Sequence, residues 1–136
     1  MFEPIREDKV WGSVIHAFAS PHASVSCLEV NKGFRCSTHR HLDRANQFIL
    51  LSGCVVIEQW IDGLDKRPHR SILIPGSILT VPSWLYHRFR VWQSGQIIEV
   101  YWPDHGGSVR PEDIDRNDTG GPDDLDELEH IIKEWG

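Results

Sequence analysis

The stretch GFRCSTHRHLDRANQFILLSG, residues 33–53, decides how this chain folds. Within it, one residue separates His39 from His41, and Asn46 and Gly53 follow after four and six intervening residues. Side chains two positions apart on a β-strand point to the same face, so the two imidazoles project together. This spacing predicts that one strand offers two ligands to a metal ion.

A second stretch, residues 76–87, places Gly76, Pro82 and His87 with five and four residues between them. His87 opens the segment HRFRVW, in which it shares one face with apolar side chains while the two arginines share the other. We expect the face with His87 to line the interior of a barrel. Three imidazoles on one divalent cation (Zn, Mn, Fe or Ni) leave positions open for substrate or water. Among the remaining histidines, His105 in the loop PDHGGS could reach a barrel mouth.

Short segments rich in β-branched and aromatic residues fill the chain from Trp11 to Trp102. None of them has helical spacing, and turn-forming residues separate them. The segments are SVIHAFA, VSCLEV, QFILL, CVVIEQW, RSILI, HRFRVW and QIIEVYW, with turns expected at Ser52-Gly53, Pro75-Gly76 and Ser94-Gly95 among others. This rhythm predicts an all-β sandwich or barrel with no helix before residue 110.

The two stretches, in this order, resemble the two motifs of the cupin superfamily. Three further matches, KVWGS at 9–13, RANQFILLSG at 44–53 and the segment 98–121, resemble the phosphomannose isomerase type II branch of cupins. The resemblance implies an all-β double-stranded β-helix, which is the cupin jelly-roll barrel. It also implies that the three histidines bind one divalent metal ion inside that barrel.

The sequence departs from the family pattern at two positions. Asn46 stands where the first motif usually has glutamate, and Trp84 stands where the second motif usually has glycine. An asparagine can still bind a metal through its amide oxygen, but it brings no negative charge. We therefore expect Asn46, helped by water or by the neighbouring Gln47, to complete a weaker metal site.

The resemblance implies a sugar or sugar-phosphate isomerase, in which a metal polarises the carbonyl of an open-chain sugar while a base moves a proton between neighbouring carbons. Such a base must be ionised and inside the barrel, and the candidates are Glu99, Glu58 and Asp43. Arg44 and Arg116 are available to bind a phosphate. Two other functions stay open: a cupin dioxygenase with a three-histidine iron site, and a non-catalytic barrel that binds a small molecule.

The charge of the chain is unevenly distributed. The net charge is −6 over 136 residues; residues 1–110 carry 12 Lys or Arg against 10 Asp or Glu, whereas residues 111–136 carry 2 against 10. The body lacks the long basic stripe of a nucleic-acid-binding protein, and no apolar run approaches the roughly 20 residues of a membrane span. We expect a cytoplasmic protein that binds neither nucleic acid nor membrane.

The end of the chain has a different pattern. Behind the candidate cap Asp123-Asp124, apolar residues recur at helical intervals, namely Leu125, Leu128, Ile131, Ile132 and Trp135. This predicts a helix over about 123–135. We divide the chain into a barrel over residues 1–110 and an acidic tail over 111–136, whose helix packs on the barrel or on a partner subunit. The exposed barrel edge and this helix favour a homodimer.

Overall fold

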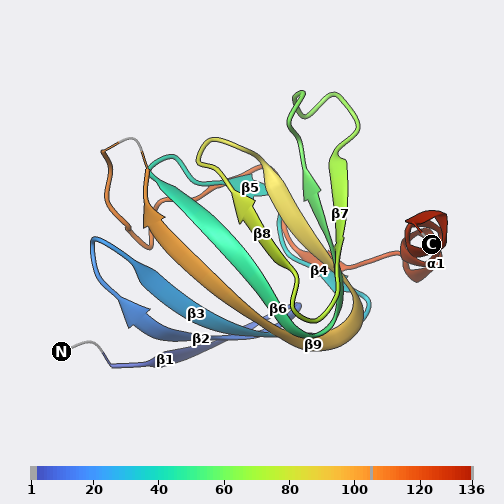
Figure 1. The fold of residues 1–136 in the computed structure, drawn as a ribbon, viewed down its shortest axis with the longest axis horizontal. Helices are drawn as coiled ribbons and strands as arrows, with labels where there is room; N and C mark the ends of the chain where they lie inside the picture. The colour runs from blue at the N-terminus through green and yellow to red at the C-terminus, as the bar shows by residue number, and fades with distance from the viewer. Residues whose placement is uncertain (1–2, 105, 136) are drawn as a thin grey trace.

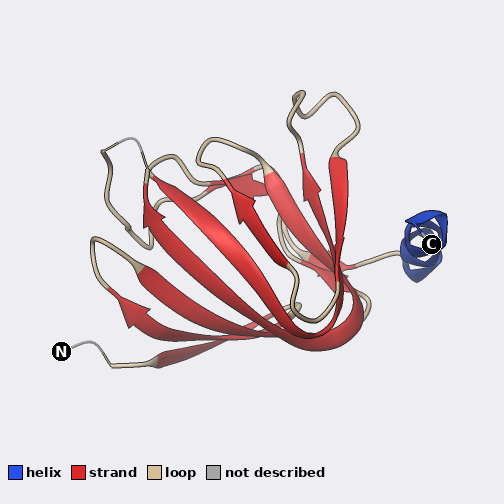
Figure 2. Ribbon diagram, in the orientation of Figure 1, coloured by secondary structure: helices blue, strands red, loops and turns tan. Residues whose placement is uncertain are grey.

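The computed structural model of the chain describes residues 3–104 and 106–135, so His105 lies outside the described residues. In this part of the chain the strands form one antiparallel sheet that curls into an open barrel, with a single helix outside it (Figure 1, Figure 2). The predicted all-β jelly-roll barrel with a short C-terminal helix is confirmed. The elements are β1 Ile5–Lys9, β2 Gly12–Ala19, β3 Ser24–Val30, β4 Phe34–Arg35, β5 His39–Arg40, β6 Arg44–Gln59, β7 His69–Leu73, β8 Ile78–Val81, β9 His87–Pro103, β10 Asp115–Arg116, β11 Gly121–Pro122 and α1 Leu125–Trp135.

Two long bent strands, β6 and β9, hold the barrel together. They pair with each other from Arg44 opposite Pro103 to Gln59 opposite His87. The first half of β6 lies between β8 and β9, in a sheet that continues through β3, β2 and β1. The second half of β6 lies between β7 and β9, in a facing sheet that β4 and β11 extend. Figure 1 shows both strands curving from one sheet into the other at the base of the barrel.

The bend in these strands replaces two of the predicted turns. The sequence pattern predicts turns at Ser52-Gly53 and Ser94-Gly95, but both pairs lie within continuous strands, at a point where the pairing register of β6 shifts. Gly53 has a φ of +87°, in the left-handed region. A Cβ on Gly95 would lie 1.9 Å from the carbonyl oxygen of Ser52. Glycine is required here because the two backbones approach closely at the bulge that turns the corner.

The interior of the barrel is apolar below the histidines. Phe89 and Val91 are buried on the same face of β9 as His87, as the alternation of side chains predicts. The buried cluster consists of Val14, Leu28, Val30, Cys36, Phe48, Leu50, Val55, Ile57, Leu73, Val81, Phe89, Val91 and Ile97. This packing fixes the strands whose polar ends carry the candidate site.

Residues after 110 wrap back over the barrel. β10 pairs with β5, and β11 pairs with β4, so the tail adds strands beside the first histidine motif. Helix α1 follows, and the carboxylate of Asp124 caps it by accepting hydrogen bonds from the N–H groups of Asp126 and Glu127. No helix among residues 3–104 and 106–135 is long and apolar enough to cross a membrane.

Helix α1 packs on the outer face of the second sheet. Leu128 and Ile131 are buried beside Val56 of β6. Beneath the helix, Arg90 of β9 is 1% exposed and donates hydrogen bonds of 2.8 Å to the carboxylate of Asp123. Arg90 does lie on the face opposite His87, but that face is buried because the helix covers it.

Candidate metal centre

Three histidines meet at the polar end of the barrel. β5 pairs with β9 at a single position, where His39 lies opposite His87, and His41 follows two residues later. The ring centroids are 4.5 Å apart for His39 and His87, 5.1 Å for His39 and His41, and 5.5 Å for His41 and His87. One ring nitrogen from each lies within 4.8 Å of the others. The fold thus joins two histidines of one motif to a third that is far away in sequence.

A backbone carbonyl orients each of these rings. The Nδ1 atoms donate hydrogen bonds at 2.7 Å from His39 to Ser37, 2.8 Å from His41 to Asp113 and 2.9 Å from His87 to Leu85. Because a carbonyl only accepts, Nδ1 carries the proton and Nε2 presents its lone pair. The Nε2 atoms of His41 and His87 are buried without a hydrogen-bond partner. Buried polar atoms rarely remain unpaired, so these atoms point to a missing ligand.

The three imidazoles are neutral at physiological pH. Burial, together with the neighbouring His87 and His41, lowers the pKa of His39 well below its usual value. Burial and then the charge of Arg44 lower the pKa of His41 to about 3, and burial lowers the pKa of His87 to about 4. Neutral imidazole is the form that binds metal ions. Three converging neutral nitrogens, with no carboxylate in the group among the described residues, fit a divalent metal that keeps open positions.

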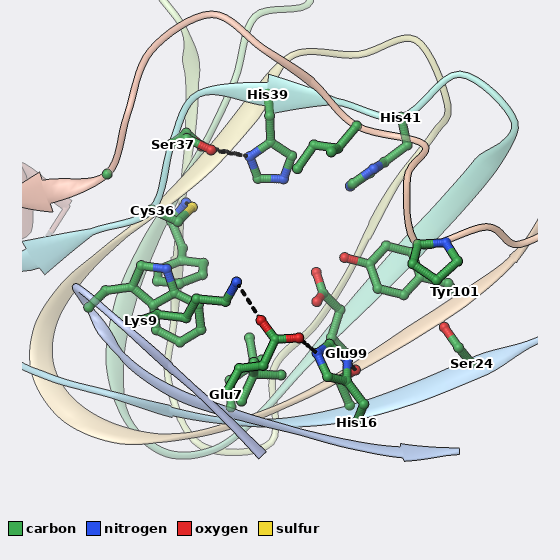
Figure 3. A pocket seen from close by; sticks show the side chains of 18 of the residues that line it. Glu7, Lys9, His16, Ser24, Cys36, Ser37, His39, His41, Glu99 and Tyr101 are labelled. Atoms are coloured by element: carbon green, nitrogen blue, oxygen red, sulfur yellow. Dashed lines mark hydrogen bonds and ion pairs between the residues drawn. The ribbon is translucent and has the colours of Figure 1, made fainter. Parts of the chain in front are cut away.

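A cavity of about 640 Å³ opens beside this group. His39 and His41 line one wall, β1 and β2 line the opposite wall, and Glu99 lies between the two (Figure 3). On the opposite wall, Nε2 of His16 lies 2.9 Å from the carboxylate of Glu7. A cavity of this size accommodates a small organic molecule.

Glu99 supplies a carboxylate to this cavity. It points inward from β9 and is 9% exposed. On the adjacent strand, Nδ2 of Asn46 donates a hydrogen bond of 3.0 Å to its Oε2. Burial raises the pKa of Glu99, and the hydrogen bond from Tyr101, the charge of Arg44 and the hydrogen bond from Asn46 offset only part of that rise. The cupin motif usually has a glutamate at the position of Asn46, and in this chain Glu99 of the adjacent strand β9 supplies a carboxylate instead.

Solved structures resemble this barrel, although no protein-family model and no curated protein matches the sequence. CapF from Staphylococcus aureus, a capsular polysaccharide assembling protein, matches with a TM-score of 0.67 at 15% identity, over 85% of this chain and 32% of CapF. A variant of Bacillus subtilis oxalate decarboxylase matches with a TM-score of 0.69 at 14% identity, over 85% of this chain and 30% of the decarboxylase. KdgF from Halomonas sp. matches with a TM-score of 0.62 at 13% identity, over 76% of this chain and 90% of KdgF.

All three of these proteins have a cupin barrel. The chain has the cupin fold. The chain spans about a third of the length of CapF and of oxalate decarboxylase, and most of the length of KdgF. Oxalate decarboxylase holds Mn(II) centres, and the three-histidine group of this cupin fits a divalent ion of that kind.

Asn46 and Gln47, both predicted as further ligands, point to opposite faces of β6. Asn46 is 1% exposed and faces the interior of the cupin barrel, where it hydrogen-bonds Glu99. The structure corrects the prediction for Gln47, because its side chain lies on the outer face and donates to the hydroxyl of Thr80 at 3.3 Å. Neighbouring residues of a strand alternate between faces, so Gln47 cannot reach the histidines.

Glu58 and Asp43, both predicted as candidate bases, do not line the cavity. Glu58 is buried on the outer face of the second sheet, where it accepts hydrogen bonds from arginines of β7 and β9. Asp43 lies just before β6, and its carboxylate pairs with Arg110. Of the three predicted bases, Glu99 is the one that faces the cavity.

The residues that the sequence patterns missed lie in the tail. Asp113 orients His41 through its carbonyl, and its carboxylate accepts hydrogen bonds from the N–H groups of Leu42 and Asp43 at 2.8 and 2.9 Å. No local spacing links residue 113 to residue 41.

Trp84, which stands where the second motif usually has glycine, also contacts the site. It has a φ of +68°, in the region that glycine favours, and its N–H donates a hydrogen bond to the carbonyl of His41 at 2.7 Å. Its departure from the motif was therefore a sign in the sequence that this residue lies next to the histidines.

Proposed function

We propose that this cupin is a metal-dependent isomerase that moves a proton between neighbouring carbons of a sugar or sugar phosphate. The observation that carries the proposal is Glu99, a buried carboxylate in the same cavity as His39 and His41. CapF, which shares the fold, is a capsular polysaccharide assembling protein, so a sugar substrate would be in line with carbohydrate chemistry on this barrel.

Proton transfer is the work that Glu99 can do from its position. Its raised pKa brings the group closer to neutral pH, where it can both remove a proton and return it. The carboxylate takes the proton from the hydroxyl-bearing carbon beside the carbonyl, and the resulting acid returns it to the former carbonyl carbon. The electron pair moves through an enediolate, and the hydroxyl proton passes to the former carbonyl oxygen, so the exchange balances without an oxidant. A divalent metal at the histidines would polarise the carbonyl and hydroxyl oxygens during this exchange.

Two neighbours hold the Glu99 carboxylate in place. Asn46 donates to it at 3.0 Å, and Tyr101 hydrogen-bonds it while its ring packs edge-on against His41 at a centroid distance of 5.3 Å. Asn46 is a positioning residue in this proposal, because it binds the carboxylate without adding a second negative charge. A glutamate at position 46 would repel Glu99 and raise its pKa further.

Turnover by the metal-loaded protein tests the proposal. Aldose and ketose phosphates and the corresponding free sugars are incubated in D₂O with protein loaded with zinc, manganese, ferrous iron or nickel. We expect interconversion and deuterium incorporation beside the carbonyl, both reduced by about 10²–10⁴-fold in Glu99→Gln. Glu58→Gln is the matched control, since it makes the same chemical change outside the cavity.

Other outcomes separate the competing functions. No interconversion and no deuterium incorporation across the panel, in protein with measured metal content, would refute the isomerase. Oxygen uptake without interconversion would support a dioxygenase with a three-histidine iron site. Tight binding of an unaltered sugar would support a non-catalytic barrel.

We also propose that the outer face of the first sheet joins two copies of the chain. An apolar row crosses five strands of this face, formed by the paired residues Ile15, Cys27, Ile98, Ile49 and Ile78. Its ends are exposed, with Ile15 at 37% and Ile78 at 61%. Strands about 4.8 Å apart make this five-stranded face roughly 24 Å wide. Along the strands, side-chain rows about 7 Å apart give it a length of roughly 20 Å.

Pairing two such faces would bury on the order of 1,000 Å², which is at the lower end for a specific protein interface. We expect sedimentation velocity to show a homodimer at micromolar concentration. Ile98→Lys, at the centre of the row, should give a folded monomer. A wild-type monomer, or a dimer unaffected by this change, would refute the assignment of the interface.

A further inference from the structure

Arg44 is a buried cation on the cavity wall beside His41. It is 7% exposed, and its guanidinium lies 4.1 Å from the centroid of the Tyr101 ring. Its Nη2 lies 3.3 Å from Nδ1 of His41, but that nitrogen already donates to the carbonyl of Asp113 and has no lone pair to offer. Nε of Arg44 is buried without any hydrogen-bond partner. At least the Nε–H of this side chain, and an Nη2–H that faces a ring nitrogen with no lone pair, therefore lack an acceptor.

Arg44 also lacks a counter-ion in the part of the chain that the structure describes. The other buried or half-buried arginines each pair with a carboxylate: Arg35 and Arg90 with Asp123, Arg40 with Asp115, and Arg70 and Arg88 with Glu58. A guanidinium stays charged at any physiological pH, and a buried charge without a partner is costly. Arg44 is the exception, because the carboxylates of Asp113 and Glu99, which its charge affects, both lie beyond ion-pair distance.

Charged side chains of both signs surround Arg44. Arg116 lines the same cavity on the other side of the histidines, opposite His39 in the strand pairing, and has no ion pair within the described ranges. Glu99 lies in the same cavity but outside ion-pair distance of Arg44, whose charge lowers the pKa of Glu99 against the effect of burial. Glu7, on the far wall, is paired with Lys9 at 3.1 Å and with His16. The carboxylates of Asp113 and Glu99 lie near enough for the charge of Arg44 to lower their pKa values, but among the described residues neither Arg44 nor Arg116 has a carboxylate at ion-pair distance.

We propose that the cavity binds substrates that carry a carboxylate or a phosphate, and that this group binds Arg44 beside the histidines. The planar guanidinium offers its terminal N–H donors to the oxygens of such an anion. The inference rests on the proposed function for the sugar part of the substrate, whereas the anion subsite stands on Arg44. It narrows the substrate class from sugars in general to sugar acids and sugar phosphates.

Thermal melting of the metal-free protein tests the subsite without any contribution from metal or turnover. The probes are inorganic phosphate, mannose 6-phosphate and glucuronate, with mannose as the neutral control, at constant ionic strength. We expect the anions to raise the Tm of the wild type and mannose to leave it unchanged. Arg44→Gln should lose the response, and calorimetry should show affinity for the anions reduced by at least about tenfold. Arg67→Gln, an exposed arginine outside the cavity, should respond like the wild type.

Further variants keep the outcome decisive. Arg44→Lys retains the charge without the planar fork, so it should still prefer anions to mannose at reduced affinity. An anion response that survives in Arg44→Gln, or an equal response to mannose in the wild type, would overturn the inference. Comparison of glucuronate with mannose 6-phosphate shows which oxyanion the subsite favours. Glu99→Gln should keep the anion response, so a failure of isomerisation with an intact response would refute the isomerase alone.

Discussion

Separate replacement of Glu58 and Glu99 by glutamine should separate the stability of this cupin from its function. Both are buried glutamates on long strands of the barrel, and both were candidate bases from their sequence context. The structure gives them opposite surroundings. Glu58 is surrounded by three arginines on the outer face, whereas Glu99 faces the cavity, where an amide and a phenol hydrogen-bond it.

The Glu58→Gln change should cost a large part of the stability. Glu58 is fully buried and accepts hydrogen bonds of 2.8 Å from Arg70 and 2.7 Å from Arg88, with Arg90 at 3.4 Å. Breaking a buried ion pair by removing one partner costs about 3–5 kcal/mol. An unfolding entropy of about 2.1 cal/mol/K per residue gives roughly 290 cal/mol/K for this chain, so the Tm should fall by about 10–17 °C.

The Glu99→Gln change should have the opposite signature. Burial raises the pKa of Glu99, which means that the fold disfavours its charged form. A neutral glutamine of the same size removes that penalty and retains a hydrogen bond to Asn46, so the free energy of unfolding should change by less than about 1 kcal/mol. Isomerase turnover should fall by about 10²–10⁴-fold, because the other carboxylate of the cavity, Glu7, lies on the opposite wall and is paired with Lys9.

Calorimetric melting at neutral pH, and turnover at a temperature at which both variants are folded, provide the assay. Glu29→Gln is the control for stability, since it makes the same change at an exposed position of β3. The reasoning fails if Glu58→Gln melts within a few degrees of the wild type. It also fails if Glu99→Gln keeps wild-type turnover, or if Glu58→Gln loses it.

Acid should release helix α1, because an arginine of β9 holds the pKa of Asp123 below its usual value in spite of burial. This stabilisation is complete above the ordinary carboxyl pKa of about 4 and is lost as the pH falls through the lowered pKa of Asp123. The free energy of unfolding in urea should therefore decrease below about pH 4 and stay constant between pH 6 and 7. Gly95→Ala should destabilise the barrel by about 3 kcal/mol or more, since the new Cβ would lie 1.9 Å from a carbonyl oxygen. Gly121→Ala is the control in the same denaturation series and should have little effect, because its Cβ would meet no atom within 4 Å. His41→Ala should weaken metal binding by at least about 100-fold in competition with a chelator, and an unchanged affinity, or an equal loss in the exposed control His69→Ala, would contradict the assignment.

Local sequence patterns were enough to predict the strands of the barrel and which side chains share a face with the histidines. The alternation of side chains along a strand is local, so the spacing of His39 and His41, and of His87 with Phe89 and Val91, predicts which side chains share a face. The structure places all five on the interior side of the barrel. The apolar stripe of the C-terminal helix is local in the same sense, and α1 ends at the residue where the pattern ends.

Which acids face the cavity depends on the packing of the whole barrel. Around Glu58, both faces of β6 are apolar, because Val55 and Ile57 fill the core while Val56 lies under helix α1. Alternation cannot tell the inside from the outside of a strand that is covered on both sides. Glu99 became identifiable as the inward acid only when the bend in β6 and β9 set the register between them.

The partners of the site also came only from the tertiary structure. The carbonyl of Asp113 that orients His41 is 72 residues away along the chain, and no spacing rule links positions so far apart. Whether Arg44 has a carboxylate at ion-pair distance can be judged only when the positions of all neighbouring carboxylates are known, and the sequence does not give those positions. Local periodicity therefore predicted the strands and the shared face of His39 and His41, and the cupin resemblance added His87, while the base, the orienting carbonyl and the anion subsite depended on long-range packing.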